Sequence, residues 1–349
     1  MGYAMGLAAM GTIAGNNRWR RQAQTLFRAG LEQRAFRRNA LFGGATMFAI
    51  AARQLTNMGL VSDRISGRMC DYAFDMFVRD CRNLSVGSPE LSTADADLIS
   101  GAVGTCVGLL HLGRTEALGV VRNLIERSAS ICRVQASDVT PEIKWREPRL
   151  GAGYVDLGLA HGVAGVLLVS AGLEGERQLA KFDQIRRGMV YLDGALVAQP
   201  WLVEDSPLGN RDRMGWCYGN AGTSWALAHF GREDALVIAK ELLRSYSLVP
   251  PDRWMVDTHG LCHGLPGILL VVAALFQHGL ISTMDLDSIQ SHVLFELGRR
   301  MEVDGLSERK DGLLVGELGT AIGLAAVAQR IDCKSCGPTS LFLPTASIY

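Results

Sequence analysis

A glycine turn that opens an apolar run recurs along this chain, and it constrains the fold more than any other feature of the sequence. The later copies carry a second glycine three residues after the first, and two degenerate copies precede them. The first glycines lie between 38 and 61 residues apart, at Gly6, Gly44, Gly101, Gly162, Gly219, Gly264 and Gly316. Glycine suits such turns because it accepts positive φ and allows close backbone approach. A period of this length predicts a repeat architecture.

The segments between the turns show two helical patterns. Stretches such as Leu118–Val134, Lys240–Tyr246 and Ile289–Met301 repeat apolar residues at helical spacing, with polar residues on the opposite side. The run after each glycine turn is apolar nearly all round, which is typical of a buried helix, and β signals are scarce. Seven pairs of one outer and one inner helix predict an all-α fold, either an open solenoid or a closed α/α toroid. A toroid would place every glycine turn at one end of its inner ring.

Charge and hydropathy exclude several classes of protein. Lysine plus arginine equals aspartate plus glutamate at 35 each, so no global field favours nucleic acid or an anionic membrane. No stretch reaches the roughly 18 apolar residues of a membrane-spanning helix. The apolar opening at residues 1–15 has its basic cluster after it, which is the wrong order for a signal peptide. We therefore predict a cytoplasmic protein with no transmembrane segment and no nucleic-acid partner.

The eight cysteines are too sparse for a disulfide scaffold. In a reducing compartment they divide into buried thiols and metal-binding or catalytic thiols. Four of them lie in apolar helical stretches and are expected to be small buried hydrophobes: Cys70, Cys81, Cys106 and Cys132.

Two other cysteines and a histidine lie at matched points of neighbouring repeats. Cys217 comes just before the fifth turn, and Cys262 and His263 come just before the sixth. Two thiolates and an imidazole suit Zn²⁺, and three protein ligands leave a fourth position open, as in catalytic zinc sites. Such an ion would deprotonate an incoming thiol and make it a nucleophile. The alternative is a buried thiol pair beside a solvated histidine.

Further polar residues lie just before other glycine turns. His161 immediately precedes the fourth turn, Asp97 lies four residues before the third, and Tyr218 follows Cys217. If the turns converge at one end of a ring, these side chains lie close together there although they are far apart in the sequence.

Several of these motifs together resemble the lanthionine synthetase C family. They are Trp-Cys-Tyr-Gly at 216–219, Cys-His-Gly at 262–264, Ala-His-Gly at 160–162 and the sevenfold glycine turn, and the resemblance runs from about Gly6 to Arg330. The family comprises the cyclases of lanthipeptide biosynthesis and the eukaryotic LanC-like proteins. The resemblance implies a toroid of seven inner and seven outer helices. It also implies addition of a peptide cysteine to dehydroalanine or dehydrobutyrine, which gives a thioether ring.

Position by position, the resemblance implies that Cys217, Cys262 and His263 hold one Zn²⁺ per chain. His161 matches a proposed general acid or base, and Asp97 matches a carboxylate needed for activity. Asp97 could orient His161, which could deliver a proton to Cα or accept the proton of the thiol. The alternatives are a satisfied histidine at the start of a helix and, for the carboxylate, the neighbouring Asp95.

Arg213 and Tyr218 match further active-site positions of the family. Thiolate addition to an unsaturated amide develops an enolate, which Arg213 could stabilise. The hydroxyl of Tyr218 could hold the substrate thiolate or a zinc-bound water. For Arg213, a solvated pair with Arg211 is the alternative.

The chain departs from the family pattern at its ends. It begins almost on the first glycine turn, so the helix that normally leads into that turn is missing and closure at the N-terminal seam is open. We expect a single toroid domain at 1–332 and a tail at 333–349, in which Cys333 and Cys336 resemble half a zinc ribbon. No kinase or dehydratase domain precedes the repeats, so a stand-alone protein is expected.

Two internal positions are also of note. Asn220 and Ala221 stand where the family often carries a proline, which is a mild departure within a turn. His259 lies three residues before Cys262 and is expected to be a polar loop residue rather than part of the site.

Three functions are compatible with these motifs. The first is a zinc-dependent cyclase that acts on a dehydrated precursor peptide. The second is a LanC-like transferase that adds glutathione to dehydrated residues, and the third is a non-catalytic, zinc-containing scaffold that binds peptides. The first function implies a lanthipeptide dehydratase and an export transporter as partners, with peripheral membrane association through that complex.

Overall fold

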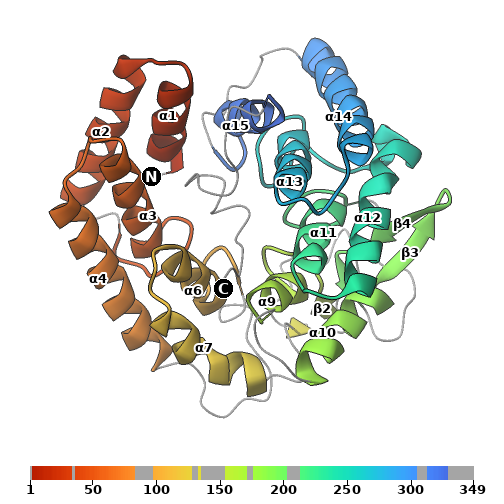
Figure 1. Ribbon diagram of the computed structural model, residues 1–349, viewed down its shortest axis with the longest axis horizontal. Helices are drawn as coiled ribbons and strands as arrows, with labels where there is room; N and C mark the ends of the chain where they lie inside the picture. The colour runs from red at the N-terminus through yellow and green to blue at the C-terminus, as the bar shows by residue number, and fades with distance from the viewer. Residues whose placement is uncertain are drawn as a thin grey trace.

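The computed structural model describes residues 2–33, 36–82, 97–127, 133–134, 154–170, 176–202, 213–304 and 313–328. These residues form two layers of helices, of which the inner one surrounds the centre of the view in Figure 1 and the outer one covers it. The predicted all-α toroid is therefore confirmed.

The inner layer consists of the apolar helices that follow the glycine motifs. They are α1 (Gly2–Ile13), α3 (Ala45–Asn57), α6 (Ala102–His111), α9 (Val163–Ser170), α11 (Asn220–Ala228), α13 (Leu265–Gln277) and α15 (Glu317–Val327). Helices α9 and α11 bury every one of their residues. A helix without a polar face is stable there because inner neighbours and outer helices surround it.

The outer layer consists of amphipathic helices. They are α2 (Asn17–Glu32), α4 (Asp63–Cys81), α7 (Glu116–Arg127), α10 (Glu176–Arg187), α12 (Glu233–Leu248) and α14 (Thr283–Asp304). Within the described ranges there are thus seven inner and six outer helices, so the seventh outer helix of the prediction is not among them. A short 3₁₀ helix, η3 (Pro251–Arg253), follows α12.

The inner ring closes at the seam that the sequence left open. Helix α1 packs against α15 as well as against α3. A Cβ at Gly6 would lie 2.4 Å from Cδ2 of Leu318, so the missing side chain makes room for α15. The prediction of a glycine turn at Gly6 was wrong, because this residue lies inside α1. Its role is close helix packing.

The second glycine of the later motifs allows the same close backbone contact in each repeat. A Cβ at any of five such glycines would lie 1.8–2.3 Å from the carbonyl oxygen of the residue six positions earlier. The pairs are Gly104 with Leu98, Gly165 with Leu159, Gly222 with Trp216, Gly267 with Leu261 and Gly319 with Leu313. The segment before each turn therefore crosses the first turn of the inner helix at backbone contact distance, which only glycine allows.

A belt of backbone hydrogen bonds joins these segments around the ring. Each bond runs from an N–H in one segment to a carbonyl in the segment before the next glycine turn. The bonds are Phe42 to Ile99 (2.9 Å), Leu98 to Ala160 (2.7 Å), Ala160 to Cys217 (3.2 Å), Cys217 to Cys262 (3.2 Å) and Cys262 to Leu314 (2.9 Å). The belt satisfies backbone groups that are buried at the centre of the ring, and it fixes the register between neighbouring turns.

β structure is scarce, as expected, and is confined to two small sheets in the described residues. Strands β1 (Arg133–Val134), β2 (Tyr154–Asp156) and β5 (Trp201–Leu202) pair antiparallel in the order β1-β2-β5. The helix expected over Leu118–Val134 ends at Arg127. Strands β3 (Met189–Leu192) and β4 (Ala195–Ala198) form a hairpin, which turns at Asp193 and Gly194 with positive φ of 51° and 81°.

Asn220 has a structural reason for standing where the family often carries proline. Its buried amide group accepts a hydrogen bond from the N–H of Ala198 (2.8 Å). The same group donates to the carbonyls of Leu196 (3.2 Å) and Leu242 (3.0 Å) and to the hydroxyl of Ser245 (2.6 Å). Asn220 thereby joins α11 to both the hairpin and α12.

Two of the four cysteines expected to be small buried hydrophobes are buried in the structure. Cys70 and Cys106 are buried, and burial raises the pKa of the Cys106 thiol far above its ordinary value, as expected of small hydrophobes. Cys81 is only partly buried, while Cys132 and the tail at 333–349 lie outside the described residues. Among the described helices, none is long and apolar enough to cross a membrane.

The repeated glycine contact makes a direct prediction. Gly222→Ala would place a Cβ 2.0 Å from the carbonyl oxygen of Trp216, so the segment that carries Cys217 must move. We expect the free energy of unfolding to fall by about 3 kcal/mol, as for other overpacked sites. Gly298→Ala is the matched control, since this exposed glycine of α14 has no atom within 4 Å of the added Cβ and alanine is the better helix former. Urea unfolding of the two variants measures the difference, and equal stability would contradict the close contact.

Candidate functional site

The belt brings two cysteines and a histidine together at one end of the ring. The ligand atoms of Cys217, Cys262 and His263 all lie within 4.8 Å of one another, and the Cys217 Sγ is 2.8 Å from Nδ1 of His263. The backbone bond from Cys217 to Cys262 aligns the two segments that carry them. Within the described ranges, no other group of three or more His, Cys, Asp or Glu residues is placed to hold a metal ion.

The chemistry of this cluster fits a divalent soft-to-borderline cation. Burial raises the pKa of the Cys217 thiol well above its ordinary value and Cys262 raises it further, although His263 opposes the effect. Contact with Cys217 raises the pKa of His263, against the opposite effect of burial. A nearby cation would favour the thiolate form of Cys217, against the effect of burial. Two sulfur ligands and one imidazole nitrogen are a donor set that suits Zn²⁺.

His161 and Asp97 meet through the neighbouring part of the belt. One carboxylate oxygen of Asp97 contacts Nδ1 of His161. The other accepts hydrogen bonds from the N–H groups of Ile99 (2.6 Å) and Ser100 (2.7 Å), which fixes the carboxylate. Burial lowers the pKa of His161, but the contact with Asp97 outweighs it and the net shift is upward. The pair therefore has an oriented imidazole that stays protonated to a higher pH than a free one.

Arg213 and Tyr218 lie on the pocket side of the cluster. The guanidinium carbon of Arg213 is 5.5 Å from the ring centre of Trp201 and 5.9 Å from that of Tyr218. Cation–π contacts at these distances hold the arginine against the aromatic wall. The ring of Tyr218 is in turn 5.5 Å from the ring of His161. Tyr218 thus lies between the cysteine–histidine cluster and the His161–Asp97 pair.

An open pocket of about 420 Å³ exposes part of this arrangement. Its walls are Arg213, Gly215, Cys217, Tyr218, Met255, Val256, Asp257 and His263. The structure therefore gathers Arg213, Tyr218, Cys217 and His263 at one pocket, while His161 and Asp97 are absent from its walls. His259 is directed elsewhere, with its Nδ1 3.3 Å from the hydroxyl of Thr320 on α15.

Sequence reasoning missed Asp156, which is almost fully buried at the end of β2. Its Oδ2 accepts a hydrogen bond from the hydroxyl of Tyr218 (3.1 Å), and its Oδ1 accepts one from the N–H of Gly158 (2.8 Å). Burial raises the pKa of this carboxyl to about 6, although His161, Gly158 and Tyr218 act against the rise. One signal was available: an acidic residue in an otherwise apolar run, six positions before the glycine of a predicted site turn.

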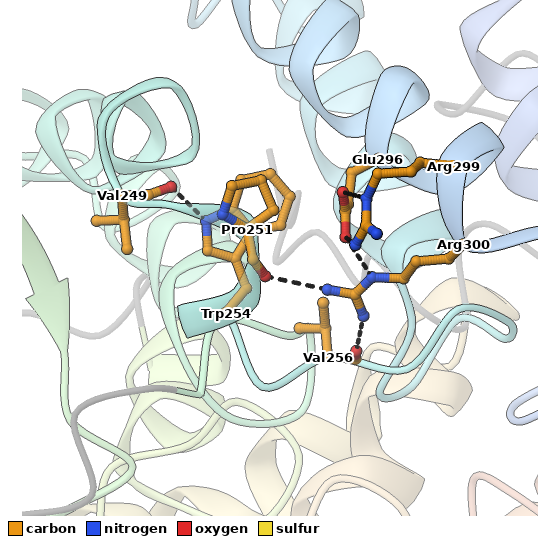
Figure 2. A network of polar contacts seen from close by, with 7 residues as sticks. All are labelled: Val249, Pro251, Trp254, Val256, Glu296, Arg299 and Arg300. Carbon is orange, nitrogen blue, oxygen red and sulfur yellow. Dashed lines mark hydrogen bonds and ion pairs between the residues drawn. The ribbon is translucent and has the colours of Figure 1, made fainter. Parts of the chain in front are cut away.

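Figure 2 shows how Arg300 of helix α14 contacts the segment that carries the pocket residue Val256. The guanidinium of Arg300 donates to the carbonyls of Pro251 and Val256. Asp257 then donates its N–H to the carbonyl of His263 (2.8 Å). Arg300 is itself held by Glu296, a buried carboxylate whose pKa is lowered to about 2 by Arg299 first and by Arg300 next. Arg300 of the outer layer is thus connected to His263 through Val256 and Asp257.

Comparison with known proteins agrees with this architecture. Residues 1–332 match the family model described as "Lanthionine synthetase C-like protein". Among solved structures 12 chains match, and one described as "Nisin cyclase" superposes with a TM-score of 0.74 at 18% sequence identity, covering 98% of this chain and 91% of the other. At that identity the likeness shows the fold alone. No curated protein matches the sequence.

Proposed function

Because the chain belongs to the lanthionine synthetase C-like family, we propose that it is a zinc-dependent lanthionine cyclase. It would add cysteine thiolates of a dehydrated precursor peptide to dehydroalanine or dehydrobutyrine and so form thioether rings. The observation that carries the proposal is the group of Cys217, Cys262 and His263, whose ligand atoms lie within 4.8 Å of one another. Two of its members, Cys217 and His263, line one pocket with Arg213 and Tyr218.

Cys217, Cys262 and His263 would hold the zinc ion. When bound, Zn²⁺ supplies the positive charge that keeps a peptide thiol ionised at neutral pH. The two cysteines are buried and His263 is more accessible, so the open side of the cluster faces the pocket. A fourth ligand position open to substrate is what separates a catalytic zinc site from a structural one.

The remaining site residues would stabilise the negative charge of the intermediate and transfer the proton. The thiolate sulfur forms a bond to Cβ of the dehydro residue, and the π electrons move onto the carbonyl oxygen as an enolate. Arg213 lies at the pocket wall and would stabilise that negative charge. When the enolate collapses, Cα takes up a proton. His161 would supply it, because contact with Asp97 raises the pKa of its imidazole. The imidazole regains a proton from solvent or from the thiol.

The substrate must carry its dehydro residues on arrival, since nothing in this chemistry removes water from serine or threonine. A dehydration reaction must therefore precede this one, and a dehydratase is the partner we propose. An export transporter and peripheral attachment to a membrane through such a complex are parts of the same proposal.

The proposal is tested with purified protein of measured zinc content and a dehydrated peptide that contains cysteine. We expect the free thiol to disappear without any change in peptide mass, because the addition is an isomerisation. Thiol alkylation followed by mass spectrometry measures both quantities. Thiol that persists at full zinc occupancy would contradict the cyclase. A mass gain that matches glutathione, when glutathione is added, would point to the transferase instead.

A further inference from the structure

We infer that Asp156 is a positioning residue. It accepts a hydrogen bond from the hydroxyl of Tyr218, and the phenol oxygen can then act toward the pocket only as a hydrogen-bond acceptor. This inference deepens the proposed function and rests on it for its meaning in the reaction. The contact itself belongs to the fold and can be tested without any turnover.

The hydrogen bond has a fixed direction because of what surrounds the carboxylate. Gly158 donates its N–H to Oδ1 of Asp156, and Tyr218 approaches Oδ2 at 3.1 Å. A carboxylate only accepts hydrogen bonds, and the phenol has a single proton to give. Donation from Tyr218 to Asp156 therefore satisfies both groups, and the carboxylate is almost completely buried, so water does not compete for it.

The local fold is built around this carboxylate. A Cβ at Gly162 would lie 2.3 Å from Oδ1 of Asp156, so the glycine of the fourth turn leaves the space that the carboxylate occupies. A Cβ at Gly158 would lie 2.6 Å from Cδ1 of Tyr218, so a second glycine makes room for the tyrosine ring. On the next strand Asp156 pairs with Trp201, which also flanks Tyr218 at a ring distance of 5.8 Å.

The direction of this bond decides what Tyr218 can do in the reaction. A phenol that gives its proton to Asp156 cannot also donate one to a developing enolate. Toward the pocket it can only accept a hydrogen bond, and the donor that a peptide substrate offers everywhere is its backbone N–H. Tyr218 would therefore orient the substrate backbone, and proton delivery to Cα is left to His161, whose ring centre lies 5.5 Å from that of Tyr218.

The closing experiment is a double-mutant cycle on the rate of thioether formation. We expect Asp156→Asn to lower kcat/KM about 10- to 100-fold, because the neutral amide oxygen accepts the Tyr218 proton more weakly than the carboxylate and the amide NH₂ brings donors that the carboxylate lacks. In a Tyr218→Phe background the same change should have less than about a twofold effect, because the group it acts through is gone. Additive losses in the two backgrounds would overturn the inference. Asp287→Asn, an exposed residue of α14, is the matched control.

A second readout does not depend on activity. In protein labelled with ¹³C at tyrosine Cζ, the Tyr218 signal is the one that disappears in Tyr218→Phe. That signal should shift in Asp156→Asn and stay in place in Asp287→Asn, because Cζ senses the hydrogen bond of the hydroxyl. If the Tyr218 signal does not move in Asp156→Asn, the inference is wrong, even if the protein is inactive. If the signal moves but the wild-type protein shows no turnover, the result counts against the cyclase alone. If Asp156→Asn does not fold, Asp156→Ser takes its place in both measurements.

Discussion

Cys217→Ala should abolish thioether formation and weaken zinc binding by more than about a hundred-fold, since the loss of even an outer partner of a zinc ligand costs about 10- to 100-fold. The two remaining ligands, Cys262 and His263, lie on a single segment and cannot surround a tetrahedral ion. The helices should survive, because the core of α11 and α13 is apolar and does not include the ligand atoms. Zinc content by metal analysis and helicity by circular dichroism measure the two effects separately.

Cys70→Ala is the control for this prediction. Cys70 is buried in α4, outside the metal cluster, so its loss should leave zinc content and turnover unchanged. Collapse of helicity in Cys217→Ala together with metal loss would favour a structural zinc and the scaffold function. Full activity of Cys217→Ala would remove the basis of the metal proposal.

His161→Ala should lower the rate of cyclisation about 10²- to 10⁴-fold, the usual contribution of a general acid, while zinc content stays at the wild-type level. The pH dependence gives a sharper check. If His161 acts as the acid, activity is present below its pKa and is lost as the pH rises through it. Contact with Asp97 raises that pKa, so Asp97→Asn should move the loss of activity to lower pH.

The control for His161 is His292→Ala. His292 is exposed on α14, and its Nδ1 lies 2.8 Å from the carbonyl oxygen of Ser288 one turn away, so its loss should not change the rate. The pH profile of kcat for the wild type, His161→Ala and Asp97→Asn carries the test. A profile that Asp97→Asn leaves unmoved, or that moves upward, would argue against His161 as a proton donor fixed by Asp97.

Much of the ring could be predicted from the sequence, and so could the candidate-site residues other than Asp156, because the glycine motif recurs at matched positions along the chain. The apolar runs after the glycines are the inner helices, and the residues before Gly162, Gly219 and Gly264 converge because the belt joins matched positions. Arg213 lies at the pocket as the family resemblance implied. The role of these side chains in catalysis remains a prediction.

The features that the sequence did not predict depend on single contacts that do not recur from repeat to repeat. Asp156 has only a weak local signal, an acidic residue in an apolar run, and its importance comes from its burial and its contact with Tyr218. Gly6 resembles a degenerate turn, yet its neighbour is Leu318 at the other end of the chain. The hairpin at 189–198 did have a local signal, the Asp-Gly pair at 193–194 that typically turns a two-residue hairpin, and the regularity of the helical pattern hid it.

Closure of the ring by α1 and α15 has a consequence for how the chain folds. Contacts between consecutive repeats join residues a few dozen positions apart, whereas Gly6 and Leu318 are separated by more than 300 residues. The entropy lost on joining such distant segments makes this the slowest contact to form, so the seam should close last. The cluster of Cys217, Cys262 and His263 belongs to adjacent repeats and can assemble while the ring is still open. The proposed zinc site would therefore be complete before the seam closes, and a bound ion would stabilise the half of the ring onto which the N-terminal helices later close.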